Sequence, residues 1–274
     1  MLQFLRTPAQ AASLLLVGAL LASGCESESP DRPAGAASSA RVDGSGKASE
    51  RAGSSVAKAT GAKKTEFGKN VWLETAGEKR RVIVGATVVL REGSFGLECL
   101  MCRKQTKEHE SILATDADAM TIHGTLLAAG AEAGSPASYD DDKRVWYPPR
   151  GMRIKVLLRY EEKGKLHTIR AQEWVKNTKT NKILDEEWVF AGSKLFPDPD
   201  GKEKPTYGAN GDGGFICIYN SPVAMLDLPV TNPNKDPQGE GREFQPFTER
   251  IPPIGTKVSV ILEPDPEAKK PVKK

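Results

Sequence analysis

The chain has 274 residues, of which 27% are charged and 38% are apolar, and its 39 basic residues nearly balance 36 acidic ones. The net formal charge of +3 argues against a dedicated nucleic-acid-binding protein, because such proteins usually carry a clear basic excess. Four cysteines are too few for a disulfide-rich scaffold. The apolar fraction is low for this length, so we expect part of the chain not to fold.

The N-terminal segment has the pattern of an export signal. Residues Ala11–Ala22 are almost wholly apolar, and Arg6 is the only charged residue before Cys25. This run is too short to span a hydrocarbon core of ~30 Å, so a permanent transmembrane helix is the weaker interpretation. The sequence LASGC, which ends at Cys25, resembles a bacterial lipoprotein signal. Residues 1–24 would then be a cleaved signal peptide; the alternative is an ordinary signal peptide with an incidental cysteine.

A lipid-modified Cys25 predicts a protein anchored in a membrane of the cell envelope. Two or more acyl chains anchor a protein stably where a single chain does not. The residue after Cys25 is Glu26. An Asp at this position would resemble an inner-membrane retention signal, and the chain lacks it. The sequence therefore favours the outer membrane over the inner membrane.

Composition separates a folded part from its flanking segments. Residues 26–63 contain no Leu, Ile, Met, Phe, Trp, Tyr or Cys, and such a segment cannot bury enough apolar surface to offset its ordering entropy. We therefore expect residues 25–65 to be the lipidated cysteine and a disordered tether. The Pro- and Lys-rich residues 265–274 are expected to be a disordered tail. A single β-rich domain is predicted for residues 66–264, which hold every aromatic residue except Phe4.

Strand patterns dominate this domain, and at least eight segments show them. They are Arg81–Leu90, Phe95–Met101, Glu110–Thr115, Arg153–Tyr160, Leu166–Val175, Glu187–Phe190, Gly214–Tyr219 and Lys257–Leu262. The fourth and fifth are separated by a short polar stretch that predicts a hairpin. The proline-rich half after Phe196 should hold loops and short strands.

One segment has the pattern of a helix. Asp116 or Asp118 is a suitable N-terminal cap, and Gly130 a suitable end. The residues between them place Ala119, Ile122, His123, Leu126 and Leu127 on one face. The predicted fold class is therefore α+β, mainly antiparallel, with a sandwich- or barrel-like body and one helix packed on the sheet.

Residues 97–134 (LECLMCRKQTKEHESILATDADAMTIHGTLLAAGAEAG) are the most distinctive part of the chain, and they resemble the YdjY family of bacterial envelope proteins. The shared pattern is a KEHES-like core followed by a strand, a helix and a Gly. The resemblance extends through residues 170–174, 188–193, 212–228 and 250–256. The family implies no activity to carry over. Some members are described as ferredoxin-type proteins, but this chain lacks the four-cysteine run that an iron–sulfur cluster needs.

Three cysteines remain if Cys25 carries lipid. Cys99 and Cys102 form a C-x-x-C inside a predicted strand, where they should lie ~10 Å apart, too far for a disulfide with each other. An oxidising envelope favours one pair among the three thiols. The resemblance implies a disulfide of Cys102 with Cys217, since both lie in its pattern. The alternatives are Cys99 with Cys217, and three buried thiols that act as small apolar residues.

Two histidines are candidates for a metal or functional cluster. His109 stands between two glutamates, and His123 lies on the predicted helix, so these two residues with Glu110 or a cysteine could bind a metal. Glu110 could instead orient a histidine for acid–base chemistry. The competing interpretation is structural: a polar pair at a turn, and a satisfied core histidine on the helix.

Catalysis is not indicated by any motif. The chain holds no G-x-S-x-G, no G-x-x-x-x-G-K-[ST] and no H-E-x-x-H. The first hypothesis is a lipid-anchored envelope domain that binds a protein or a small ligand and is not an enzyme. The second is a metal- or thiol-dependent accessory of envelope redox chemistry.

Overall fold

The computed structural model describes residues 61–93, 96–198, 200–201, 204–231 and 243–269. Its strands are β1 (Lys63–Gly68), β2 (Val71–Ala76), β3 (Lys79–Val88), β4 (Cys99–Arg103), β5 (Ser111–Thr115), β6 (Ser138–Asp140), β7 (Val145–Tyr147), β8 (Arg153–Glu162), β9 (Lys165–Arg170), β10 (Val175–Asn177), β11 (Trp188–Phe190), β12 (Leu195–Phe196), β13 (Thr206–Tyr207), β14 (Gly214–Cys217), β15 (Leu226–Asp227), β16 (Phe244–Pro246) and β17 (Lys257–Asp265). The α-helices are α1 (Ala119–Ala128) and α2 (Gly208–Asp212), and short 3₁₀ helices cover Glu108–Glu110, Ala171–Trp174, Thr248–Arg250 and Pro266–Lys269.

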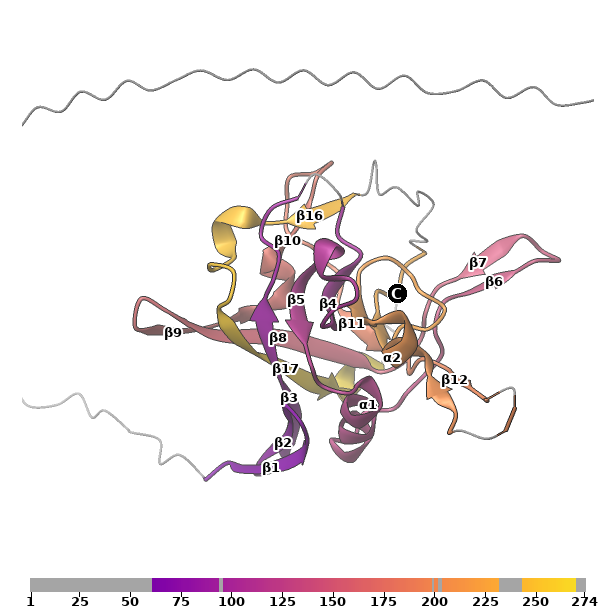
Figure 1. Cartoon of the computed structure of the whole chain (residues 1–274), viewed down its shortest axis with the longest axis horizontal. Coiled ribbons are helices and arrows are strands. Elements are labelled where there is room, and N and C mark those ends of the chain that lie inside the picture. The colour runs from indigo at the N-terminus through magenta and orange to yellow at the C-terminus, as the bar shows by residue number, and fades with distance from the viewer. Residues whose placement is uncertain (1–60, 94–95, 199, 202–203, 232–242, 270–274) are drawn as a thin grey trace, which may run out of the picture. The chain divides into compact units, whose positions relative to one another are not determined.

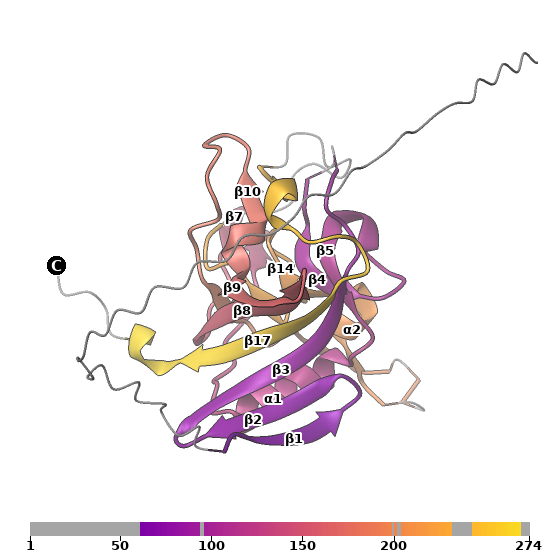
Figure 2. The same cartoon turned by 90° about the vertical axis from the view of Figure 1, so that its left-hand side faces the viewer.

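Eight strands close into a barrel in the order β3-β17-β8-β11-β15-β14-β4-β5, and β5 pairs back with β3. Most neighbours are antiparallel, whereas β4–β5 and β14–β15 are parallel. Figure 2 shows β2, β3, β17 and β8 side by side along one wall. The sequence predicts a β-rich body that is sandwich-like or barrel-like, and the barrel-like form is confirmed.

Three strands, β1, β2 and β9, extend the sheet beyond the barrel. β1 pairs with β2, which pairs with β3, and β9 pairs with β8. The remaining strands form three separate two-stranded sheets, β6–β7, β10–β16 and β12–β13. The β6–β7 and β8–β9 hairpins project from the body in Figure 1.

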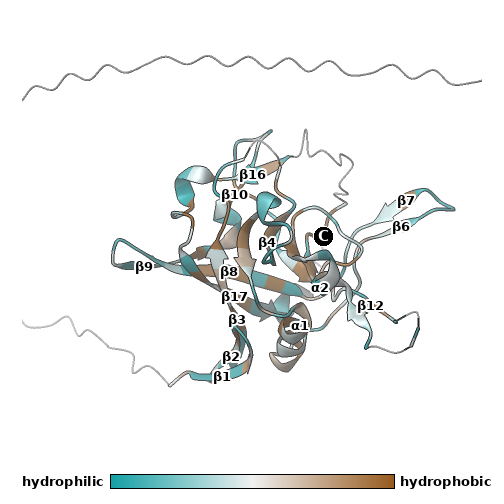
Figure 3. Ribbon diagram, viewed as in Figure 1, coloured by the Kyte–Doolittle hydropathy of each residue, from teal (hydrophilic) through white to brown (hydrophobic). Residues whose placement is uncertain are grey.

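The alternation of side chains along the barrel strands fills the core. Val82, Val84, Ala86 and Val88 of β3 are buried, as are Ile154, Val156 and Leu158 of β8. Trp174 and Trp188 are the largest fully buried side chains, and the Trp188 indole donates a hydrogen bond to the carbonyl of Cys217 at 2.8 Å. Burying a large apolar side chain contributes about 1.5–3 kcal/mol, so each of these side chains stabilises the barrel. Figure 3 shows the apolar residues gathered on the barrel strands, with polar residues on the projecting hairpins.

Helix α1 begins where the capping pattern predicts. The carboxylate of Asp118 accepts a hydrogen bond from the Thr121 backbone N–H at 2.7 Å, as an N-terminal cap does. Ile122 and Leu126 are fully buried, but Leu127 is exposed, so the buried face is narrower than predicted. The structure also has a second helix, α2, where the sequence predicts only one; it contacts α1.

The predicted hairpin is confirmed, with Glu162 paired to Lys165 across its turn. The predicted strand through Val175 is wrong in its second half, because residues 171–174 form a 3₁₀ helix. The Glu173 carboxylate accepts a hydrogen bond from the Arg170 N–H at 3.3 Å, which closes the turn and ends β9.

The domain boundaries also differ from those predicted. β1 begins at Lys63, inside the segment predicted as tether, because its backbone pairs with β2 although its side chains are exposed. At the other end, β17 and a 3₁₀ helix continue into the predicted tail. The signal peptide and Cys25 lie outside the described residues. In the part of the chain that is described, no helix is long and apolar enough to cross a membrane.

Candidate functional site

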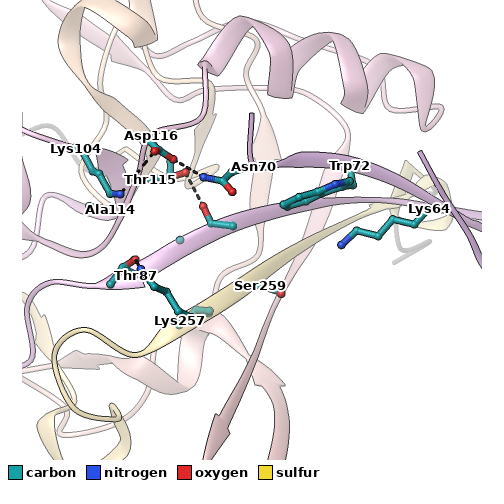
Figure 4. A pocket seen from close by; sticks show the side chains of 13 residues that line it. Lys64, Asn70, Trp72, Thr87, Lys104, Ala114, Thr115, Asp116, Lys257 and Ser259 are labelled. Atoms are coloured by element: carbon teal, nitrogen blue, oxygen red, sulfur yellow. Dashed lines mark hydrogen bonds and ion pairs between the residues drawn. The ribbon is translucent and has the colours of Figure 1, made fainter. Parts of the chain in front are cut away.

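A polar cleft of about 320 Å³ opens where β2, β3, β5 and β17 meet. Gly85 and Thr87 of β3 line it and alternate with buried residues, so the cleft lies on the side of β3 that faces away from the core. Figure 4 shows Lys64 and Trp72 toward one end of the cleft, and Lys104 and Asp116 toward the other.

Three lysines from distant segments line the cleft. The Lys257 ammonium, at the start of β17, donates a hydrogen bond to the Thr87 hydroxyl at 3.1 Å. The Lys64 ammonium lies 4.0 Å from the centroid of the Trp72 ring, in cation–π contact. Lys104 follows β4, and its Nζ lies 3.8 Å from the Asp116 carboxylate. The three ammonium groups thus face one cavity from β1, from β17 and from the turn after β4.

Asp116 is the carboxylate at the end of the cleft, and it is already neutralised. Lys69 Nζ lies 2.7 Å from it, and the Asn70 amide donates a hydrogen bond to it. The Lys69 contact, followed by those with Asn70 and Lys104, lowers the pKa of Asp116 to about 2 despite partial desolvation. In the described residues neither Lys64 nor Lys257 forms an ion pair, so the cleft has a net positive charge.

The turn between β1 and β2 positions one wall of the cleft. Asn70 has a φ of 58°, a left-handed conformation that Asn tolerates better than most residues. Its carbonyl accepts a hydrogen bond from the Gly85 N–H at 2.9 Å. A Cβ at Gly85 would lie 3.2 Å from the Asn70 side chain, so the glycine lets the turn approach β3. The residues of this site are distant in the sequence, and their only local signal is the polar turn before Trp72.

The predicted metal cluster does not assemble. The His109 side chain is 76% exposed, and its Nε2 lies 4.0 Å from Glu110. His123 on α1 instead contacts Tyr207, with 2.8 Å between Nδ1 and the hydroxyl. Because the Tyr207 hydroxyl donates to the Gly192 carbonyl at 3.0 Å, His123 Nδ1 must be the donor of their hydrogen bond. Among the described residues no group of three or more His, Cys, Asp or Glu could hold a metal ion.

The three cysteines outside the signal are buried thiols on two neighbouring strands. The register of β4 and β14 places Cys217 opposite Cys99 and places Gly214 opposite Cys102. The sulfur atoms of Cys99 and Cys217 lie 3.6 Å apart. In the structure Cys217 thus lies opposite Cys99 and not opposite Cys102, the implied partner, and all three are unpaired thiols. The physical reason is that Cys102 lies three residues along the extended strand from Cys99. This moves it ~10 Å away from the position opposite Cys217.

A half-buried cluster of charged residues lies beside these thiols. Lys107 Nζ is 2.9 Å from the Glu98 carboxylate and 3.3 Å from that of Asp212. Burial alone would lower the pKa of Lys107, but the negative charges around it outweigh burial and raise it. Burial raises the pKa of Glu98, and a hydrogen bond with Glu110 raises it further, against the opposing effect of Lys107. The KEHES segment and the DGG segment are thus brought together around one lysine.

Comparison with known proteins places the chain in a family. The model of the YdjY domain matches residues 73–263, which include β3 to β16 and most of β17. Lys64 and Trp72 of the cleft precede the matched range, whereas the Lys107 cluster and all three cysteines fall within it. No curated protein and no solved structure matches the chain. Since the family model covers well over half of the sequence, this chain belongs to the YdjY domain family.

Proposed function

We propose that this protein is a lipid-anchored protein of the cell envelope whose domain binds a small anionic ligand, a carboxylate or a phosphate. The observation that carries the proposal is that one cleft is lined by the ammonium groups of Lys64 and Lys257, neither of which forms an ion pair within the described residues. Lys104 adds a third positive charge, and Asp116 is neutralised by Lys69. An anion would receive several charge-assisted hydrogen bonds there.

The shape of the cleft supports binding of a small molecule. A cavity of about 320 Å³ is at the lower end of the range of ligand sites. Lys64 is held by the Trp72 ring and Lys257 by the Thr87 hydroxyl. Both ammonium groups are therefore partly ordered before a ligand arrives, which lowers the entropic cost of binding. The lining residues offer ammonium groups and hydroxyls to a bound anion. We propose binding alone, without catalysis.

Replacing Lys257 by Ala should weaken anion binding by a factor of about 10 to 150, because one charge-assisted hydrogen bond contributes roughly 1.5–3 kcal/mol. The measurement is calorimetric titration of the full-length protein in detergent with citrate and, separately, with inorganic phosphate. Lys165→Ala is the matched control, since Lys165 is an exposed lysine on β9 outside the cleft. Binding should also weaken as salt is raised. Equal losses in the two variants, or no binding by the wild type, would refute the cleft as the site.

Replacing Cys25 by Ser should abolish lipid labelling and move the protein from the membrane fraction to the soluble fraction. The physical reason is that the acyl chains proposed to anchor the protein are attached to Cys25. Radiolabelled palmitate and membrane flotation measure the two effects, and a density gradient of wild-type membranes tests the preference for the outer membrane. Cys102→Ser is the control and should keep both the label and the membrane location. A labelled, membrane-bound Cys25→Ser variant would rule out this anchor.

A further inference from the structure

The strand register places Cys99 and Cys217 in the geometry of a cross-strand pair. The two residues are opposite each other on antiparallel β4 and β14, next to a register shift between Ile216 and Cys217. The Ile218 N–H donates a hydrogen bond to the Glu98 carbonyl at 2.8 Å, so the neighbouring pair of cysteines lies at a non-hydrogen-bonded position. Opposite residues at such positions have Cα atoms about 4.5 Å apart, within the range that a disulfide requires.

The two sulfur atoms face each other within the barrel wall. They are 3.6 Å apart, so a shift of about 1.5 Å would bring them to the bonding distance of a disulfide. A Cβ on Gly214 would lie 3.0 Å from the Cys217 sulfur and 3.1 Å from that of Cys99. The absence of a side chain at this glycine therefore leaves room for the pair.

The surroundings make the two thiols unequal. The ammonium of Lys107 lies close enough to Cys99 to interact with its charge, and Glu98 and Asp212 hold that ammonium in place. The hydrogen bond to Cys99, followed by burial, raises the pKa of Cys217 well above its ordinary value. Cys217 therefore keeps its proton, which leaves Cys99 as the attacking sulfur of the pair.

Cys102 is set apart from this pair. It faces Gly214 in the register, and burial raises its pKa to about 11, against the effect of a contact with the Ser111 hydroxyl. Its thiolate is therefore scarce at neutral pH, and it has no opposite sulfur.

We propose that Cys99 and Cys217 are a redox pair that hydrogen peroxide oxidises to a cross-strand disulfide. The Cys99 thiolate attacks one peroxide oxygen and breaks the O–O bond, which gives a sulfenic acid and a hydroxide that is protonated to water. The Cys217 sulfur then attacks the Cys99 sulfur, and its proton leaves with the sulfenic hydroxyl as a second water. Two thiols and one peroxide thus yield one disulfide and two waters, with two electrons passing from sulfur to oxygen. Peroxide is only slightly larger than water, which suits a buried pair, and the reaction does not depend on the ligand cleft.

The test is peroxide oxidation of the reduced full-length protein in detergent, followed by mass spectrometry without reduction. One equivalent of peroxide should remove two hydrogens and link the peptides that contain Cys99 and Cys217. Because Cys99 and Cys102 share a peptide, the Cys102→Ala variant is included and should retain the link. Cys99→Ala and Cys217→Ala should each lose it. A link that disappears in Cys102→Ala, or no loss of hydrogens in the wild type, overturns the proposal.

The role of Lys107 gives a second readout. Lys107→Met should slow the oxidation at least fivefold at neutral pH and leave the product unchanged, whereas the exposed control Lys165→Met should not alter the rate. In Cys217→Ala the sulfenic acid cannot resolve, so dimedone should label Cys99 and not Cys102. Labelling of Cys102, or equal rates in wild type and Lys107→Met, would show that the attacking thiol has been wrongly assigned.

Discussion

Replacing Gly151 by Ala is expected to lower the free energy of unfolding by more than about 3 kcal/mol, because the new methyl group would collide with backbone. A Cβ at this position would lie 2.1 Å from the carbonyl oxygen of Phe190. That oxygen cannot easily move, since it accepts a hydrogen bond from the Gly134 N–H at 2.9 Å. The Phe190 N–H is fixed as well, by a hydrogen bond to the Met152 carbonyl at 2.8 Å.

The matched control is Gly124→Ala in helix α1. A Cβ there would have no atom within 4 Å, so the methyl group enters open space. Alanine in a helix interior is about 0.5–1 kcal/mol more favourable than glycine, so this variant should be slightly more stable than the wild type. Urea denaturation followed by circular dichroism measures both. A Gly151→Ala protein as stable as the wild type would mean that β11 lies further from Gly151.

The second large effect is a pH dependence of stability that arises from Asp227. This side chain is fully buried on β15, and its carboxyl accepts hydrogen bonds from the backbone N–H groups of Leu228 (2.8 Å) and Ser221 (3.1 Å) and from the Asn220 amide (3.2 Å). Burial disfavours the charged form more than these three bonds favour it, and it raises the pKa of Asp227 from 3.8 to about 7.

Whether stability rises or falls with pH depends on which state, folded or unfolded, binds the proton more tightly. Between pH 4 and 7 the folded protein holds a proton on Asp227 that the unfolded chain has lost, so this residue makes the protein less stable as pH rises through that window. Relative to high pH, protonated Asp227 adds about 4 kcal/mol to the free energy of unfolding. This addition is complete below about pH 4 and is lost above about pH 7. Asp227→Asn should remove this part of the change in the free energy of unfolding with pH.

Urea unfolding from pH 4.5 to 8.5 checks the prediction. Asp116→Asn is the control, because the pKa of Asp116 is lowered to about 2 and it therefore does not titrate in this range. That variant should keep the wild-type slope. If Asp227→Asn also keeps it, the three hydrogen bonds dominate over burial and Asp227 is ionised in the folded protein.

Local patterns predicted the elements whose determinants lie close together in the chain. Asp118 caps α1 three residues from the backbone group that it contacts, and the turn between β8 and β9 joins strands that pair with each other. In contrast, β1 was missed because its side chains are exposed and polar, and only pairing with β2 makes it a strand.

The barrel closure and the candidate site depend on long-range pairing that sequence patterns do not contain. β5 closes the ring through only two residue pairs with β3, Thr87 with Ala114 and Val88 with Leu113. The cleft lysines lie far apart in the sequence, and each one alone has the appearance of an ordinary solvated lysine. For the same reason the choice between Cys99 and Cys102 as the partner of Cys217 needed the register of β4 and β14.

The outer strands of the eleven-stranded sheet bear on how this protein avoids aggregation. β1 and β9 each pair on one side only within the described residues, so each offers unsatisfied backbone groups to another chain. β1 begins with Lys63 and Lys64, and β9 begins with Lys165 and ends with Arg170. A strand added at either edge would have to bring its backbone against these charges, which is a common way in which β proteins block edge-to-edge association. A chain concentrated on a membrane surface by a lipid anchor would benefit from that protection.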